Sequence, residues 1–89
     1  MEGLTQFALL PNPTAGITLL QLQFDHSVAQ LDVHILDLLG RSVWESHTAA
    51  ADRFAAPLDL SGYPDGLYLV YIAADGRQAV QKLVKSSRQ

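Results

Sequence analysis

The sequence predicts an all-β fold, an antiparallel β-sandwich of about seven short strands joined by turns. Short runs rich in Val, Ile, Leu and Tyr recur along the chain, and clusters of Gly, Pro, Asn and Asp separate them. No stretch carries the apolar repeat of a long helix. The predicted strands are residues 4–10, 17–24, 31–35, 41–46, 57–60, 67–73 and 78–85.

The first two predicted strands are separated by an abrupt break, Pro11-Asn12-Pro13. Each proline fixes φ and lacks a backbone N–H, so neither a helix nor a central strand can cross this stretch. Each proline also pushes the residue before it toward extended backbone. We therefore expect a loop that stops the first strand and sets the register of the second.

A hairpin is predicted at residues 37–40, Asp-Leu-Leu-Gly, because Asp at the first position and Gly at the fourth are typical of a type I turn. The strand before it alternates cleanly, with Leu31, Val33 and Ile35 on one face. Residues 47–56 are rich in alanine, and we expect them to form an irregular connection.

The strongest strand signal is residues 67–73, which are apolar or aromatic on both faces and therefore predict a central, buried strand. Gly66 opens this strand after a cluster of turn residues, and Asp75-Gly76 fits a two-residue type I′ hairpin turn. The last strand, residues 78–85, does not alternate strictly, so we expect a β-bulge in it.

Tyr68 lies at the start of the penultimate strand, where a tyrosine corner of an immunoglobulin-like sandwich would stand. The antibody form of that fold has a cysteine two residues later, where this chain has Val70, so an antibody-type domain is excluded. The expected core consists of Val33, Ile35, Val43, Leu58, Leu60, Tyr68, Val70 and Ile72.

Length and composition suit one small globular domain spanning residues 1–89. Of its 89 residues, 48% are hydrophobic and 17% are charged, which is not the composition of a disordered segment. Because the chain has no cysteine, disulfides and thiolate metal sites are excluded. No apolar run approaches the ~20 residues that span a bilayer, so we expect no membrane insertion.

The charges are unevenly distributed along the chain. All nine acidic residues lie within residues 1–76, and four of the six basic residues follow them without an intervening acid. An acidic body of this kind disfavours nucleic-acid binding. The basic residues of this last part are Arg77, Lys82, Lys85 and Arg88. The simplest interpretation is that they are exposed to solvent.

The residue types of catalytic and metal sites occur, but not in workable patterns. His26, His34 and His47 have none of the spacings of a zinc site. Residues 25–27 read Asp-His-Ser, yet adjacent residues cannot converge as orienter, base and nucleophile. The sequence therefore predicts no catalytic residues, no metal, no cofactor and no enzymatic activity.

The aromatic residues leave two interpretations open. Trp44, Tyr63 and Tyr71 either form a platform that binds a sugar or a peptide, or they pack in the core and at the sheet edges. Small sandwiches use their aromatic residues more often in the second way.

The order of the motifs is more specific than any one of them. It runs Pro11-Asn12-Pro13, Asp37-Leu38-Leu39-Gly40-Arg41, Leu58-Asp59-Leu60-Ser61-Gly62, Gly66-Leu67-Tyr68-Leu69-Val70 and Lys82-Leu83-Val84-Lys85. This series closely resembles the C-terminal sorting domain of the type IX secretion system, in the type A form of the Por secretion system family, over nearly the whole chain. The resemblance carries the export-signal motif over to Pro11, Asn12, Pro13, Gly40, Gly66, Tyr68, Lys82, Val84 and Lys85.

The resemblance implies a non-catalytic export signal. Such domains end secreted proteins of Bacteroidetes, carry an N-terminal cargo from the periplasm through an outer-membrane translocon to the cell surface or medium, and are usually removed by a sortase-like protease. We would then expect this chain to be a piece of a longer secreted protein. The sorting domains often end within a residue or two of the last lysine, whereas this chain continues after Lys85.

Two other functions remain open from the sequence. The first is a cell-surface binding or adhesion module of fibronectin or carbohydrate-binding type, which holds a ligand and stays attached. The second is a structural spacer between domains.

Overall fold

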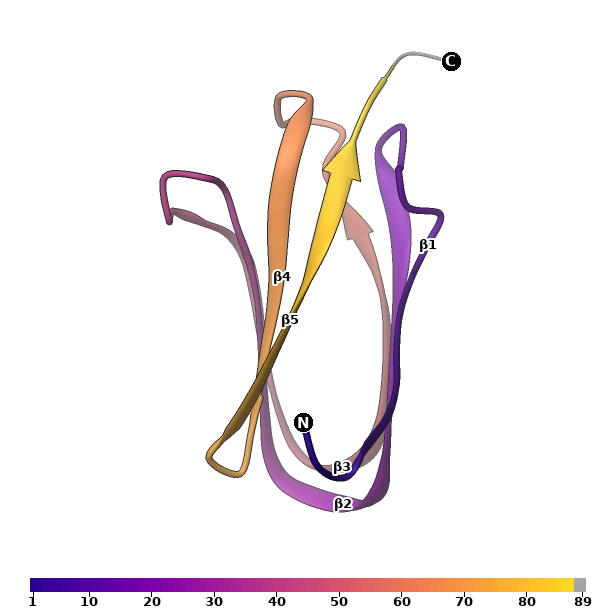
Figure 1. The fold of residues 1–89 in the computed structure, drawn as a ribbon, viewed down its shortest axis with the longest axis vertical. Coiled ribbons are helices and arrows are strands. Elements are labelled where there is room, and N and C mark those ends of the chain that lie inside the picture. Colours follow the sequence, from indigo (N-terminus) through magenta and orange to yellow (C-terminus); the bar gives the residue numbers. More distant parts are fainter. Residues whose placement is uncertain (88–89) are drawn as a thin grey trace.

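The computed structural model describes residues 1–87, so Arg88 and Gln89 lie outside the described residues. The fold is all-β and antiparallel, as predicted, and residues 1–87 include no helix, hence none long and apolar enough to cross a membrane. Five strands make up the sheet, and Figure 1 shows their arrangement. They are β1 (Leu4–Leu10), β2 (Ile17–Leu36), β3 (Ser42–Asp59), β4 (Gly66–Ala74) and β5 (Arg77–Lys85).

β2 is the central strand, and its two halves have different neighbours. The first half pairs with β1, the second half pairs with β4, and β3 pairs with both halves. The pairing with β3 is interrupted between Gln23 and Val28. At that level β2 and β3 curve together through a deep bend (Figure 1), so the sheet folds over and its inner face encloses the core.

The prediction of about seven short strands is wrong, because two pairs of predicted strands are each one continuous strand. Residues 25–30 lie between two predicted strands, and residues 47–56 were expected to form an irregular connection, yet these stretches continue β2 and β3. Their side chains lose the alternation of a flat strand, since Asp25, His26 and Ser27 are all exposed at the bend. Pairing between the two bent strands therefore outweighs the weak local preference of these residues.

The core lies between the two arms of the bent sheet. Seven of the eight predicted core residues are buried, and Val43 is half-buried against them. The predicted core did not include a second group of buried residues from β1, β2 and β5, namely Leu9, Leu20, Leu22, Phe24, Val28 and Leu83.

Both predicted hairpin turns are confirmed. Gly40 N–H donates to the Asp37 carbonyl at 3.0 Å, which is the hydrogen bond of a β-turn. Asp75 and Gly76 have φ of +49° and +81°, as a type I′ turn requires. The Asp75 carboxylate also accepts hydrogen bonds from the backbone N–H groups of Ala29 and Gln30, so this turn is tied to the bend of β2.

The prediction of a β-bulge in β5 is wrong, because its register with β4 is unbroken from Gly66↔Lys85 to Ala74↔Arg77. Inward and outward side chains alternate regularly along β5. The sequence does not show this alternation, because two of the inward positions carry polar residues. Gln81 is half-buried and donates to the Phe7 carbonyl of β1 at 3.1 Å, and Lys85 is buried.

The tyrosine corner expected at Tyr68 is present. The Tyr68 hydroxyl donates to the Pro64 carbonyl at 2.6 Å, four residues upstream, while the ring is buried in the core. Burial raises the pKa of this hydroxyl. The hydrogen bond fixes the end of the β3–β4 loop against β4.

Replacing Tyr68 with phenylalanine should lower the free energy of unfolding by about 1 kcal/mol, because one hydrogen bond to a part-buried carbonyl is lost while the ring still packs. Urea denaturation measures the change. Tyr71→Phe is the matched control, since Tyr71 is half-buried on the outer face of the same strand and its hydroxyl has no partner among the described residues. Equal stability of Tyr68→Phe and the unmodified domain would contradict the corner's role.

Candidate functional site

The Pro11-Asn12-Pro13 loop lies against the last strand. Asn12 donates from Nδ2 to the Lys82 carbonyl at 2.8 Å and accepts at Oδ1 from the Val84 N–H at 3.0 Å. Its amide therefore pairs with β5 as the backbone of a neighbouring strand would. The flanking prolines keep the loop out of the regular sheet, and the Pro11 carbonyl is fixed by the Thr18 hydroxyl at 2.6 Å.

Thr14 extends this contact by two residues. Its N–H donates to the Val84 carbonyl at 2.9 Å and its carbonyl accepts from the Ser86 N–H at 2.8 Å, which makes a short parallel bridge to β5. The Thr14 side chain is buried, and its hydroxyl donates to the Ile17 carbonyl at 2.7 Å. The outward backbone groups from the Lys82 carbonyl to the Ser86 N–H are therefore hydrogen-bonded.

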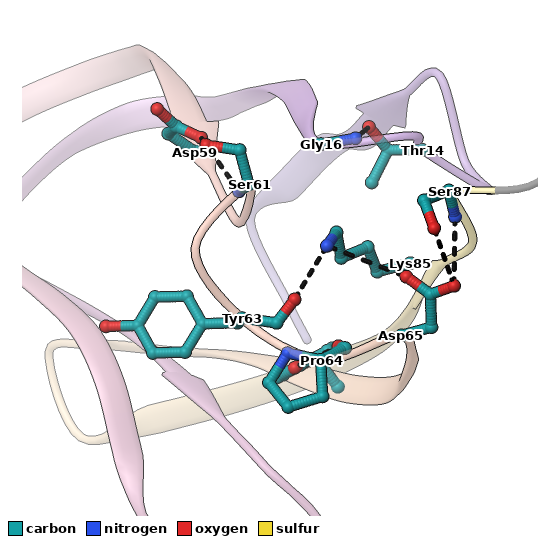
Figure 2. A network of polar contacts seen from close by, with 10 residues as sticks. Thr14, Gly16, Asp59, Ser61, Tyr63, Pro64, Asp65, Lys85 and Ser87 are labelled. Carbon is teal, nitrogen blue, oxygen red and sulfur yellow. Dashed lines mark hydrogen bonds and ion pairs between the residues drawn. The ribbon is translucent and has the colours of Figure 1, made fainter.

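Lys85 points inward and is only 7% exposed. Figure 2 shows its ammonium reaching the β3–β4 loop, where it donates to the Tyr63 carbonyl at 2.6 Å and lies 3.6 Å from the Asp65 carboxylate. Asp65 also accepts hydrogen bonds from the N–H and hydroxyl of Ser87. These contacts, led by the Ser87 N–H, lower the pKa of Asp65.

Three segments that are far apart in the chain thus meet at the end of β5. We call residues 11–16, 60–66 and 82–87, with the contacts between them, the C-terminal cluster. Lys85 links the end of β5 to the β3–β4 loop (Figure 2), and Asn12 and Thr14 link it to the loop after β1.

Most of the predicted export-motif residues lie in or beside this cluster. Gly66 pairs with Lys85, Tyr68 pairs with Leu83, and Val84 pairs with Leu67. Gly66 has φ of +150°, a conformation that side chains rarely adopt. Gly40 lies apart in the β2–β3 turn, where its φ of +83° allows the turn.

Four residues that complete the cluster were not among the predicted export-motif residues, namely Thr14, Tyr63, Asp65 and Ser87. The burial of Thr14 could not be predicted, because no local pattern indicates that a threonine after Pro11-Asn12-Pro13 will be buried. Asp65 belongs to the predicted turn cluster before Gly66, and its role in the C-terminal cluster depends on a lysine that is 20 residues later in the chain.

The comparison with protein families decides the identity of this chain. The model described as the secretion system C-terminal sorting domain matches residues 8–86. The chain belongs to this family. The resemblance to type IX secretion sorting domains is therefore confirmed, and the family implies a C-terminal export signal that is in general non-catalytic. A comparison with curated proteins gave no match.

The sorting domain also carries a polar network on β2 and β3. His47 contacts the Asp32 carboxylate at 2.6 Å and Glu45 at 3.3 Å, and His34 lies 3.7 Å from Glu45. The hydrogen bond to Asp32, followed by that to Glu45, raises the pKa of His47, and the same bond lowers the pKa of Asp32. Within residues 1–87, no group of three or more His, Asp or Glu side chains is arranged to hold a metal ion.

The three residue types of a hydrolytic triad do not form one in the sorting domain. Asp25 and His26 are 2.6 Å apart, but both side chains are more than half exposed, at the bend of β2. Ser27 makes no side-chain hydrogen bond to His26 in the part of the chain that the structure describes.

The aromatic residues of the sorting domain do not share one face. Trp44 pairs with the buried Ile35 and packs half-buried against the core. Tyr71 pairs with His34 on the outer face, and Tyr63 lies in the β3–β4 loop with its hydroxyl bonded to the Val43 carbonyl. A flat platform of all three rings is therefore not formed, which favours the packing interpretation.

Proposed function

We propose that this sorting domain directs an N-terminally attached cargo from the periplasm across the outer membrane by type IX secretion, to the cell surface or medium. The domain would be recognised by translocon components and then removed by a sortase-like protease. The single observation that carries this proposal is the family match over residues 8–86. The bent five-stranded sheet would then be a version of an immunoglobulin-like sandwich.

The placement of the chain supports this function. Met1 and the bend of β2 lie toward one end of the molecule, whereas β5 ends at the opposite end, beside the Pro11-Asn12-Pro13 loop (Figure 1). A cargo that precedes residue 1 would therefore leave the C-terminal cluster accessible to a translocon.

The export-motif residues have two kinds of role in this proposal. Asn12, Gly66, Tyr68 and Lys85 hold the C-terminal cluster in shape, because their contacts are made within the domain. Lys82 and Val84 are exposed and available to a partner. The remaining motif residues set turns and loops, and these are Pro11, Pro13 and Gly40.

The experiment is to fuse all 89 residues to the C-terminus of a periplasmic reporter in a bacterium that carries the type IX system. The reporter should reach the surface or medium, and it should stay in the periplasm in a strain without the translocon. A reporter fused to an unrelated β-sandwich of similar size is the control. If the intact fusion stays in the periplasm of the competent strain, the proposed function is wrong, and a retained binding module becomes the better explanation.

A further inference from the structure

The two lysines of the last strand have opposite orientations. Lys85 is buried in the C-terminal cluster, whereas Lys82 is exposed on the outer face of the sheet. Residues three apart in a strand lie on opposite faces, so the separation itself requires this. Of these two lysines, only Lys82 can contact a partner while the domain stays folded.

Lys82 is surrounded by apolar side chains on that outer face. Val80 and Val84, two residues away on each side, are 56% and 37% exposed. The register of β5 with β4 places Leu69 directly opposite Lys82. We call the outward residues of this hairpin the outer patch, and they are Leu67, Leu69, Tyr71, Val80, Lys82 and Val84.

The outer patch continues onto the next strand. Leu36 of β2 pairs with Leu69, and His34 pairs with Tyr71, so half-exposed side chains extend across three strands. On this face of β2 and β3, the carboxylates of Asp32 and Glu45 contact His47. Within residues 1–87, no carboxylate lies within 4.0 Å of Lys82.

Protection of a sheet edge does not account for Lys82. Lysines on edge strands commonly prevent another chain from pairing with free backbone groups. Here the Lys82 carbonyl and the Val84 N–H are already bonded to Asn12, and the Val84 carbonyl is bonded to Thr14. The edge is closed at this position, so the face beside it, rather than the edge, is the surface that a partner can use.

We propose that the outer patch is the docking surface for a translocon component that presents apolar side chains and a carboxylate opposite Lys82. This inference rests on the proposed function and names the chemistry of the partner. An ammonium group among apolar side chains loses water when a surface covers it, and a carboxylate at that point compensates the loss. Charge complementarity therefore selects an acidic, apolar partner surface.

The test uses the reporter fusion described above, with single substitutions in the 89-residue domain. Lys82→Glu would place a carboxylate opposite the carboxylate proposed on the translocon component. The two negative charges repel, so the reporter should appear outside the cell about tenfold more slowly, or slower still. Lys82→Arg keeps the charge and should export at a rate close to that of the unmodified fusion. Ile17→Glu is the matched control, because Ile17 is 58% exposed but lies on the outer face of the other arm.

The melting temperature of each purified domain separates docking from folding. Lys82→Glu and Ile17→Glu should melt within a few degrees of the unmodified domain, as exposed substitutions do. Export of the Lys82→Glu fusion at the rate of the unmodified fusion overturns the docking proposal. The proposal is also overturned if Ile17→Glu lowers the export rate as much as Lys82→Glu does. A large loss of melting temperature in Lys82→Glu also overturns it, because Lys82 would then belong to the fold. If the unmodified fusion is not exported, the proposed function itself fails, and the docking proposal fails with it.

Discussion

Replacing Ile72 with alanine should lower the free energy of unfolding by about 2–5 kcal/mol, the largest effect expected of any single substitution here. Ile72 is fully buried in the middle of β4, between β2 and β5, and its side chain faces the core. Truncation would remove buried apolar surface and leave a cavity that the surrounding strands cannot fill without shifting. Urea denaturation measures the change directly.

Val80→Ala is the control for Ile72→Ala. It removes a branched side chain from the adjacent strand, but Val80 is 56% exposed and lies on the outer face. Its effect should stay within about 0.5 kcal/mol. For a domain of this size, a loss of 1 kcal/mol lowers the melting temperature by about 4–8 °C, so thermal melting should separate the two variants clearly. Equal stabilities would mean that β4 does not face the core as described.

Replacing Lys85 with alanine should destabilise the domain by about 2–4 kcal/mol, although lysine is usually a surface residue. The Tyr63 carbonyl would lose a charged donor at 2.6 Å, and the buried part of the lysine side chain would be removed. Lys85→Met keeps much of that apolar volume and removes only the donor, so it should cost less than Lys85→Ala.

The control for Lys85 lies three residues earlier. Lys82→Ala changes the same residue type in the same strand, but Lys82 is exposed and its side chain makes no hydrogen bond within residues 1–87. The free energy of unfolding should change by no more than about 0.5 kcal/mol. If Lys82→Ala and Lys85→Ala were equally stable, the buried contact of Lys85 with Tyr63 would have no role in stability.

Features that depend on local chemistry could be predicted from the sequence. The two prolines around Asn12 exclude a helix and a central strand by their own backbone chemistry, and Asp75-Gly76 can adopt the positive φ values of a type I′ turn without help from the rest of the chain. The Tyr68 hydrogen bond is similarly local, because its acceptor is four residues away. The all-β, antiparallel fold follows from these turns and the runs between them.

Features that depend on pairing between distant segments could not be predicted. Residues 47–56 look irregular alone and become a strand because β2 bends beside them. The partners of Asn12 on β5 are separated from it by 70 residues or more, and no local pattern indicates them. The spacing of Lys82 and Lys85 predicts that they lie on opposite faces of the strand. Which of the two is buried, and against what, depends on the complete fold.

The closure of β5 by Asn12 and Thr14 makes the folded state of the domain depend on its last strand. The groups at residues 82–86 complete hydrogen bonds with a loop that precedes them by 70 residues or more. Contacts over such long sequence separations form late, because the intervening chain must first be ordered. A chain truncated before Lys82 would lack all of these contacts, so we expect it not to complete the fold described here.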